Sequence, residues 1–149
     1  MHLFFYGTLT HHHANPVTRE VLPLLGKGRR ASVAASLYAV GTPEGWYPAL
    51  LDGPGRVHGW LYRTGPEFDS AALARLDLYE NYVPRHPRGS EYLRRRMPVR
   101  LTKGGTLLAQ VYRWNRRVDS AMVHLPEGDF AAWLDAAPHA RLAFARLYD

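Results

Sequence analysis

The chain has 149 residues, of which 46% are hydrophobic and 21% charged, and it contains no cysteine. This length fits a single domain with a substantial core, and the composition excludes a disulfide scaffold, a thiolate metal site and a cysteine nucleophile. Lysine and arginine total 19 against 13 acidic residues, which gives a formal net charge of +6. Only Lys27 and Lys103 are lysines, and the arginines are scattered apart from the run Arg94–Arg96. A scattered charge is not typical of a nucleic-acid interface.

Neither a membrane segment nor a secretory signal is expected. No stretch reaches the roughly 18–20 consecutive apolar residues that a membrane-spanning helix requires. The first residues, MHLFFYGTLT, lack the basic region and the long apolar run of a secretory signal. We therefore expect one cytoplasmic domain over residues 1–149 without a membrane partner, either a monomer or a homodimer.

The first part of the chain predicts strands separated by a short helix and by turns. His2–Tyr6 is short, aromatic and apolar and is followed by Gly7, which indicates a buried strand. Asn15 before Pro16 is a helix-start pair, because asparagine caps the first turn and the fixed φ of proline suits it. The next three segments are predicted, in chain order, as a strand over 30–40, a turn-rich segment over 41–55 and a strand over 57–63.

The second part predicts a helix, a loop, two strands and further helical segments. Apolar residues at helical spacing indicate a helix over Ala71–Tyr79 capped by Asp69 or Ser70. A loop over 83–90, two strands over 92–101 and 106–114 joined at Gly104-Gly105, a short helix over 130–136 capped by Asp129 and a last helical stretch from Pro138 follow. This order predicts a mixed α/β domain, a mostly antiparallel small β-barrel or curved sheet with short helices packed outside.

The end of the first strand is one candidate for chemistry. Gly7 lets the backbone lie close to a ligand, and the amides of Thr8 and Leu9 can point into the same space. The turn that starts at Tyr6 could therefore hold a carboxylate or stabilise an oxyanion without charged side chains. An ordinary turn is the alternative.

Glu80 is a second candidate, because it ends the helix in the segment LDLYENY, residues 76–82, between aromatic residues. A carboxylate among aromatic side chains loses hydration, which raises its pKa and makes it a usable base near neutral pH. Asp77 precedes Glu80 by three residues, so the two carboxylates could share a helical face. Alternatively, both acids lie on a solvated helix end.

A third candidate is the segment from Glu91 to Arg94. In a strand, Tyr92 and Arg94 share one face, while Glu91 points to the other. A tyrosine and an arginine on one face could bind an amino-acid-like ligand, or they could form a salt bridge at the rim. Glu91 is a second candidate base, because element ends near it are uncertain by a few residues.

Metal, phosphate and nucleic-acid sites are not indicated. The run His11–His13 predicts a solvated turn, because consecutive residues point in different directions whereas metal ligands must converge. No phosphate-binding glycine fingerprint and no serine nucleophile elbow occur. The arginines of Arg94–Arg96 and of the loop at Arg85 and Arg88 could bind nucleic acid, but strand alternation points Arg95 away from its neighbours. We therefore expect no nucleic-acid partner.

Short motifs in a fixed order resemble those of the γ-glutamylcyclotransferase-like superfamily. The first is Y-G-T-L at Tyr6–Leu9, and the match extends over about residues 2–135, with the segment 138–149 as a C-terminal extension. The further motifs are WYPAL (46–50), VHGWLY (57–62), LDLYE (76–80), YLR (92–94), VYRW (111–114) and GDF (128–130).

The resemblance implies a mixed α/β barrel with a pocket beside Tyr6–Leu9. It implies that Glu80 is the catalytic acid/base, that Tyr47 and the pair Tyr92 and Arg94 contact substrate, and that no metal or cofactor is required. The reaction would be intramolecular: the α-amine of a γ-glutamyl group attacks its own γ-carbonyl, 5-oxoproline forms and an amine or amino acid leaves. The partner would be a small γ-glutamyl or amino-acid-like molecule.

Two departures from the family pattern leave alternatives open. Family members often have glycine after the helix-end glutamate, whereas this chain has Asn81. Some bacterial relatives carry their acid directly before the tyrosine of the Y-x-R motif, where this chain has Glu91, so either Glu80 or Glu91 could be the base. A noncatalytic small-ligand-binding domain of the same fold is the alternative function.

Overall fold

A computed structural model describes residues 1–7, 15–43 and 45–136 of the chain. Within these residues the elements are, in order, β1 (His2–Phe5), α1 (Pro16–Val21), the 3-10 turn η1 (Leu22–Leu24), β2 (Arg29–Thr42), β3 (Gly45–Arg63), α2 (Ser70–Tyr79), the 3-10 turn η2 (Pro87–Gly89), β4 (Tyr92–Leu101), β5 (Thr106–Trp114), β6 (Val123–His124) and α3 (Phe130–Ala136). No helix in these ranges is both long and apolar enough to cross a membrane.

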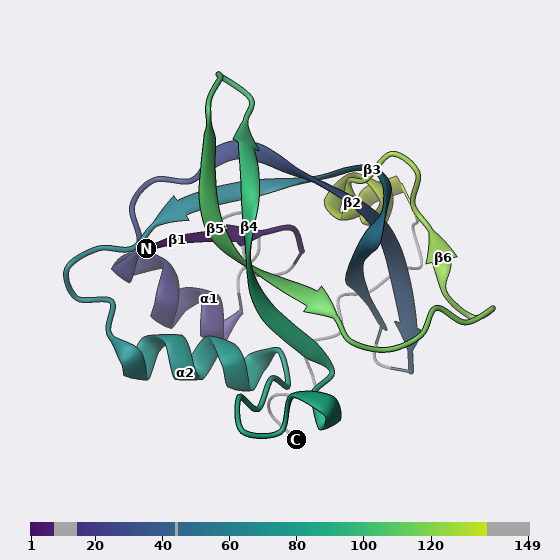
Figure 1. The fold of residues 1–149 in the computed structure, drawn as a ribbon, viewed down its shortest axis with the longest axis horizontal. Coiled ribbons are helices and arrows are strands. Elements are labelled where there is room, and N and C mark those ends of the chain that lie inside the picture. Colours follow the sequence, from purple (N-terminus) through teal and green to yellow (C-terminus); the bar gives the residue numbers. More distant parts are fainter. Residues whose placement is uncertain (8–14, 44, 137–149) are drawn as a thin grey trace.

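The strands form a closed barrel. Their order is β3-β1-β5-β4-β2, and β2 pairs with β3 to close the ring, while the short β6 is added to β2. The pairing of β1 with β5 is parallel, and the other pairings are antiparallel. This arrangement confirms the predicted mixed, mostly antiparallel barrel (Figure 1).

Two apolar layers lie on the two faces of the strands. Alternate residues such as Phe4, Val33 and Val111 fill the barrel interior. Residues of the opposite parity, including Phe5 and Tyr112, pack outward with α2 residues such as Leu76. In Figure 1, α1 and α2 lie together on one side of the strands, and α3 lies on the other side of the molecule beside β2 and β3. Because side chains alternate along each strand, consecutive residues serve different layers.

The three predicted helix starts are confirmed. The side chains of Asn15, Asp69 and Asp129 each accept a hydrogen bond at 3.0 Å from the backbone N–H three residues later. Asp69, not Ser70, is therefore the cap of α2. The predicted helical stretch from Pro138 lies outside the described residues.

The prediction of a turn-rich segment over 41–55 is wrong for most of its length. Residues from Gly45 onward belong to β3, which pairs antiparallel with β2 from Thr42↔Gly45 onward. The register shifts between Ala34 and Ser36 of β2, and Gly55 of β3 has a φ of +108° near this irregularity. Glycine at this point allows the strand to bend around the barrel without ending.

Candidate active site

Asp77 is the acceptor at the centre of a buried polar cluster between α2 and the barrel. Its side chain accepts from Arg94 Nε at 2.8 Å and Nη2 at 3.3 Å, and from the Tyr112 hydroxyl at 2.7 Å. Asp77 is 7% exposed. The alternative of a solvated helix end is therefore wrong for Asp77, which connects α2 to β4 and β5.

The guanidinium of Arg94 is engaged on three sides. Besides Asp77, it donates to the Gln110 side chain at 3.2 Å and lies 5.7 Å from the ring centre of Tyr82. Burial acts to lower the pKa of Arg94, but the hydrogen bond and charge of Asp77 outweigh it, so the net shift is upward. These contacts give Arg94 a role in holding α2 against the strands, and a direct contact with substrate stays a prediction.

Glu80 lies at the C-terminal end of α2, where the helix closes in a Schellman motif. The N–H of Tyr82 donates to Asp77 O at 2.9 Å, and the N–H of Asn81 donates to Leu78 O at 3.1 Å. This closure requires a left-handed residue, and Asn81 has a φ of +51°. Asparagine tolerates that conformation better than most residues, which explains its presence where the family resemblance leads us to expect glycine.

The end of β1 lies close to this helix end. The Tyr6 hydroxyl donates to Tyr112 O at 2.5 Å. Burial raises the pKa of Tyr6 well above its ordinary value, and the negative charge of Glu80 raises it further, while Arg113 acts in the opposite direction. Burial, Asp77 and, more weakly, Glu80 also raise the pKa of Tyr112. The charge of Glu80 therefore acts on both buried hydroxyls.

Three of the predicted site residues meet around Pro48. A Cβ on Gly7 would lie 2.5 Å from Pro48 Cγ, so only glycine fits there. The Tyr92 hydroxyl donates to Pro48 O at 2.5 Å, and Tyr47 precedes Pro48 on β3. The rings of Tyr47 and Tyr92 lie 6.0 and 5.2 Å from that of Trp114. These contacts position the strand end that leads into the predicted binding loop.

Glu91 lies on a segment directly beside the end of α2. Its N–H donates to Asn81 O at 3.0 Å, and its carbonyl accepts from Asn115 N at 2.9 Å. The intervening loop is held by the buried Ser90, whose hydroxyl accepts from Val83 N at 2.8 Å. The structure therefore brings the segments of both candidate bases together.

Arg113 is a candidate site residue that the sequence motifs did not indicate. It follows Val111 by two residues and so shares the interior face of β5, at the end of the barrel where Tyr6 lies. Its guanidinium forms an ion pair with Asp52 of β3. Its Nε is buried and has no hydrogen-bond partner among the described residues, a condition shared with Trp114 Nε1 on the opposite face of β5. The feature of the sequence that could have indicated Arg113 is a charged residue at a strand position that faces the barrel interior.

Several predicted residues cannot be placed. Thr8, Leu9 and His11–His13 lie outside the described residues. Within the described ranges, no group of three or more histidine and acidic residues is arranged to hold a metal ion.

A closed barrel with a helix-end carboxylate beside a Tyr-Gly strand end fits the family that the sequence motifs resemble. A family model described as "Gamma-glutamyl cyclotransferase, AIG2-like" matches residues 3–133. The chain therefore belongs to the γ-glutamylcyclotransferase, AIG2-like family. It is similar to the γ-glutamylcyclotransferase family protein YtfP of Escherichia coli, with 33% identity over 135 residues that cover 91% of this chain and 97% of YtfP.

Solved structures show the same fold. The solution structure of E. coli YtfP aligns with a TM-score of 0.59 and 28% identity, covering 92% of this chain and 99% of that one. The crystal structure of a mouse AIG2-like protein aligns with a TM-score of 0.58 and 27% identity, covering 78% of each chain. The family resemblance and the fold predicted from the sequence are thereby confirmed.

Proposed function

We propose that the protein is a γ-glutamyl cyclotransferase that releases 5-oxoproline from a small γ-glutamyl amine or γ-glutamyl amino acid. Family membership supports this class of reaction. The observation that supports the proposal for this chain is the pair of hydrogen bonds from Tyr6 to Tyr112 and from Tyr112 to Asp77, which connect the strand end before Gly7 to the helix end that carries Glu80. The direction of the Tyr6 pKa shift agrees with a nearby Glu80 charge.

The reaction is an intramolecular acyl transfer. The substrate α-amine attacks only as the neutral amine, so its ammonium proton is first lost to solvent. The amine nitrogen then forms a bond to the γ-carbonyl carbon while Glu80 accepts one of its two remaining protons. The bond between that carbon and the leaving nitrogen breaks, Glu80 delivers its proton to that nitrogen, and the free amine takes up a proton from solvent. Atoms and charge balance without oxidation or reduction, so the chemistry calls for no cofactor.

Positioning accounts for the remaining part of the proposed mechanism. Nucleophile and electrophile belong to one molecule, so the protein chiefly has to hold a cyclisable conformer. Backbone amides at Gly7 and the following residues would stabilise the developing oxyanion. Arg113, whose buried Nε lacks a partner among the described residues, would bind the substrate's α-carboxylate. Tyr47 and Tyr92, whose rings pack with Trp114, would support the strand end at Pro48 and Gly7.

The assignment of the base is tested by matched glutamate variants. Release of 5-oxoproline from a panel of γ-glutamyl amines and dipeptides is measured by mass spectrometry for wild type, Glu80→Gln, Glu91→Gln and the exposed control Glu67→Gln. We expect Glu80→Gln to lower kcat at least a hundredfold, because general acid–base groups contribute about 10²–10⁴-fold, and the other two variants to retain activity. Loss of activity in Glu91→Gln alone would assign the base to Glu91.

The same panel separates catalysis from binding. If the wild-type protein is thermally stabilised by γ-glutamyl compounds but releases no 5-oxoproline from any of them, the noncatalytic binding domain replaces the enzyme as the function. The expected cytoplasmic location is a further part of the proposal, supported by the absence of cysteine, and cell fractionation tests it.

A further inference from the structure

A cavity of about 540 Å³ lies between the start of β2, β3 and the β4–β5 turn. Trp60 and Leu101 give it apolar surface from the two faces of the sheet, Trp60 from the outer layer and Leu101 from the interior side. Four cationic side chains also line it: Lys27, Arg29, Arg30 and Lys103. Seven ladder positions of β4 separate this turn from the Leu93↔Arg113 pair near Tyr6. At roughly 3.3 Å per residue this places the turn that carries Lys103 about 23 Å from that pair. The opposite edge of the cavity is nearer, because Trp60 pairs with Phe5, the residue before Tyr6.

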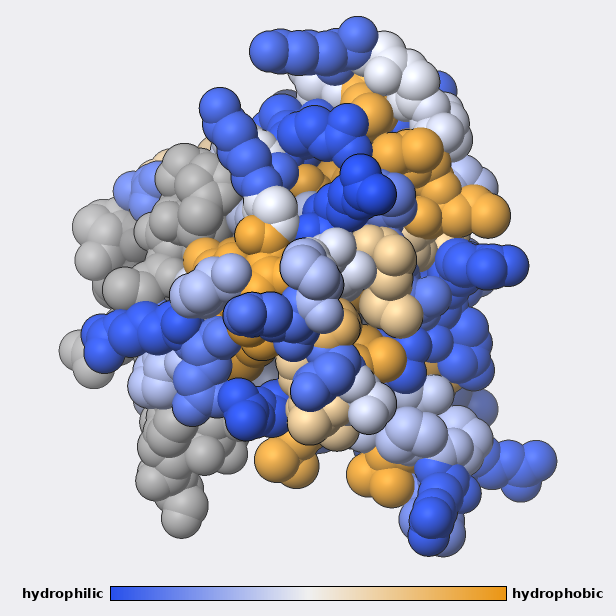
Figure 2. Space-filling model, turned by 90° about the vertical axis from the view of Figure 1, so that its left-hand side faces the viewer, coloured by the Kyte–Doolittle hydropathy of each residue, from blue (hydrophilic) through white to orange (hydrophobic). Residues whose placement is uncertain are grey.

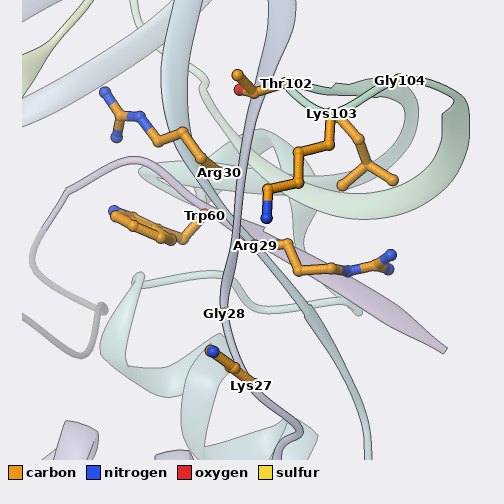
Figure 3. Close-up of a pocket in the computed structure, with 9 residues that line it drawn as sticks. Lys27, Gly28, Arg29, Arg30, Trp60, Thr102, Lys103 and Gly104 are labelled. Atoms are coloured by element: carbon orange, nitrogen blue, oxygen red, sulfur yellow. The ribbon is translucent and has the colours of Figure 1, made fainter.

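The cavity is built on hydrogen-bonded strands. Arg30 is paired with Trp60 across β2 and β3, and Ala31 is paired with Leu101 across β2 and β4. The N–H of Thr102 donates to Arg30 O at 3.0 Å, which ties the β4–β5 turn to β2. In Figure 3, Lys103 extends from this turn toward the strand that carries Arg29, and Arg30 lies beside Trp60. The sheet thus sets the spacing of Arg29 and Arg30, and the Thr102 hydrogen bond holds the turn that carries Lys103 next to β2.

The lining combines unpaired positive charge with an aromatic surface. Both lysines of the chain are here, and no carboxylate lines the cavity. Arg30 pairs with Asp129 at 2.7 Å and lies 5.5 Å from the ring centre of Trp60. The other three cations form no ion pair with any residue that the structure describes. Clustered like charges repel one another, and a bound anion relieves that repulsion.

The surroundings reinforce the positive field. Partial burial lowers the pKa of His2, and the positive charges of the chain's amino group, Arg29 and Arg63 lower it further. Figure 2 shows the face at the left of Figure 1, where the chain starts and β2 begins: hydrophilic side chains surround exposed apolar groups. Such a surface suits an anion that carries an apolar part.

We propose that this cavity binds a small phosphorylated molecule of nucleotide size, with its phosphate groups between Lys27, Arg29 and Lys103 and its apolar part against Leu101. The volume lies within the range of about 300–1,000 Å³ that small-molecule sites occupy. Lysine and arginine are the side chains that bind phosphate oxygens with charge-assisted hydrogen bonds. Three unpaired cations fit a di- or triphosphate better than a single carboxylate.

The test is calorimetric titration of the full chain with ATP, tripolyphosphate, adenosine and a single-stranded oligonucleotide. The variant Lys27→Ala/Lys103→Ala removes two cations from the cavity, and the control Arg19→Ala/Arg117→Ala removes two exposed cations elsewhere. We expect ATP to bind wild type and control within twofold of each other and the cavity variant at least tenfold more weakly. Tripolyphosphate should bind more weakly than ATP, and adenosine should not bind.

Four outcomes would overturn the proposal. These are no ATP binding to wild type, equal weakening in both double variants, adenosine binding as tight as that of ATP, and binding of the oligonucleotide alone, which would identify a nucleic-acid surface instead. Release of 5-oxoproline should be equal in wild type and the cavity variant, since neither lysine is one of the candidate active-site residues. A large loss would show that the cavity is coupled to the active site and would contradict two separate sites.

Discussion

Arg94 Nε donates to Asp77 Oδ1 at 2.8 Å, and this contact joins β4 to the last turn of α2. Three residues after Asp77 comes Glu80, the proposed base. Because the Tyr112 hydroxyl donates to the same oxygen at 2.7 Å, the carboxylate is fixed from two strands at once. The polar cluster therefore holds the helix end on which Glu80 lies. Asp77 belongs to the L-D-x-x-E motif and Arg94 to the Y-x-R motif, so this contact joins the two family motifs.

Removal of Asp77 should be costly. Asp77→Ala leaves the Arg94 guanidinium, 19% exposed in its side chain, without its anionic partner. We expect a loss of about 3 kcal/mol in the free energy of unfolding, since breaking a buried ion pair costs about 3–5 kcal/mol. Urea denaturation measures it. As a control, Arg75→Ala removes an ion pair to Glu20 with both side chains more than half exposed, and should cost less than about 1 kcal/mol. Equal losses in the two variants would contradict a specific role for Asp77.

A methyl group at Gly7 should disturb the active-site end of the barrel. The added Cβ of Gly7→Ala would lie 2.5 Å from Pro48 Cγ, in a rigid ring that cannot rotate away. We expect a loss of about 1–3 kcal/mol in unfolding free energy, typical of overpacking, together with a loss of 5-oxoproline release. Gly89→Ala is the matched control, because no atom lies within 4 Å of its Cβ. If Gly7→Ala keeps wild-type stability and activity, Pro48 can move to make room for the added methyl group, and the prediction is wrong.

Stability should fall at alkaline pH because of Tyr6 and Tyr112. Burial raises the pKa of both hydroxyls in the folded protein, whereas in the unfolded chain a tyrosine ionises near pH 10. Below pH 10 both states hold these protons, and stability is unaffected. Above it the unfolded state loses them first, so stability declines by about 1.4 kcal/mol per pH unit for each tyrosine.

Urea unfolding between pH 8 and pH 11 measures this slope. Tyr6→Phe and Tyr112→Phe should each make the fall of the unfolding free energy with pH less steep by the contribution of one tyrosine. This expectation holds whatever effect each substitution has on stability at pH 8. An unchanged slope in both variants would show that the two hydroxyls ionise normally in the folded protein.

Arg113 should affect substrate binding more than the chemical step. If its guanidinium binds the substrate α-carboxylate, Arg113→Ala should raise KM at least tenfold with a smaller change in kcat, because a charge-assisted hydrogen bond is worth about 1.5–3 kcal/mol. Arg113→Lys should recover part of the affinity. Asp52→Asn removes the exposed partner of Arg113, whose side chain is 87% accessible, and should change KM less than twofold. A fall in kcat at constant KM would contradict this role.

The sequence correctly predicts those helices and strands that are determined by residues close together in the chain. Asn15, Asp69 and Asp129 each accept from an amide three residues later, so three helix starts were visible in short segments. The hairpin of β4 and β5 was predicted with its observed bounds, because alternation and the Gly104-Gly105 turn suffice to define it. The positive φ values of both glycines, 109° and 91°, agree with that turn.

Features that depend on residues distant in the chain could not be predicted from the sequence. Glycine and proline between residues 45 and 55 indicated turns, yet pairing with β2 makes them part of one long strand. Neither the burial of Asp77 nor its contact with Arg94 is encoded near Asp77, because the partner lies 17 residues away. The sequence did not indicate a role for Arg113 for the same reason, because its ion-pair partner, Asp52, lies on another strand.

The motif order by itself determined membership of the γ-glutamylcyclotransferase family, a mixed barrel and an acidic helix end. Only the tertiary structure decided which polar groups lie together: Tyr112 bonded to both Tyr6 and Asp77, Arg94 held by Asp77, and the two lysines in the lining of one cavity. The reason is physical. Residue types and spacings act through neighbours in the chain, whereas burial and charge interactions depend on distances in space that barrel closure sets.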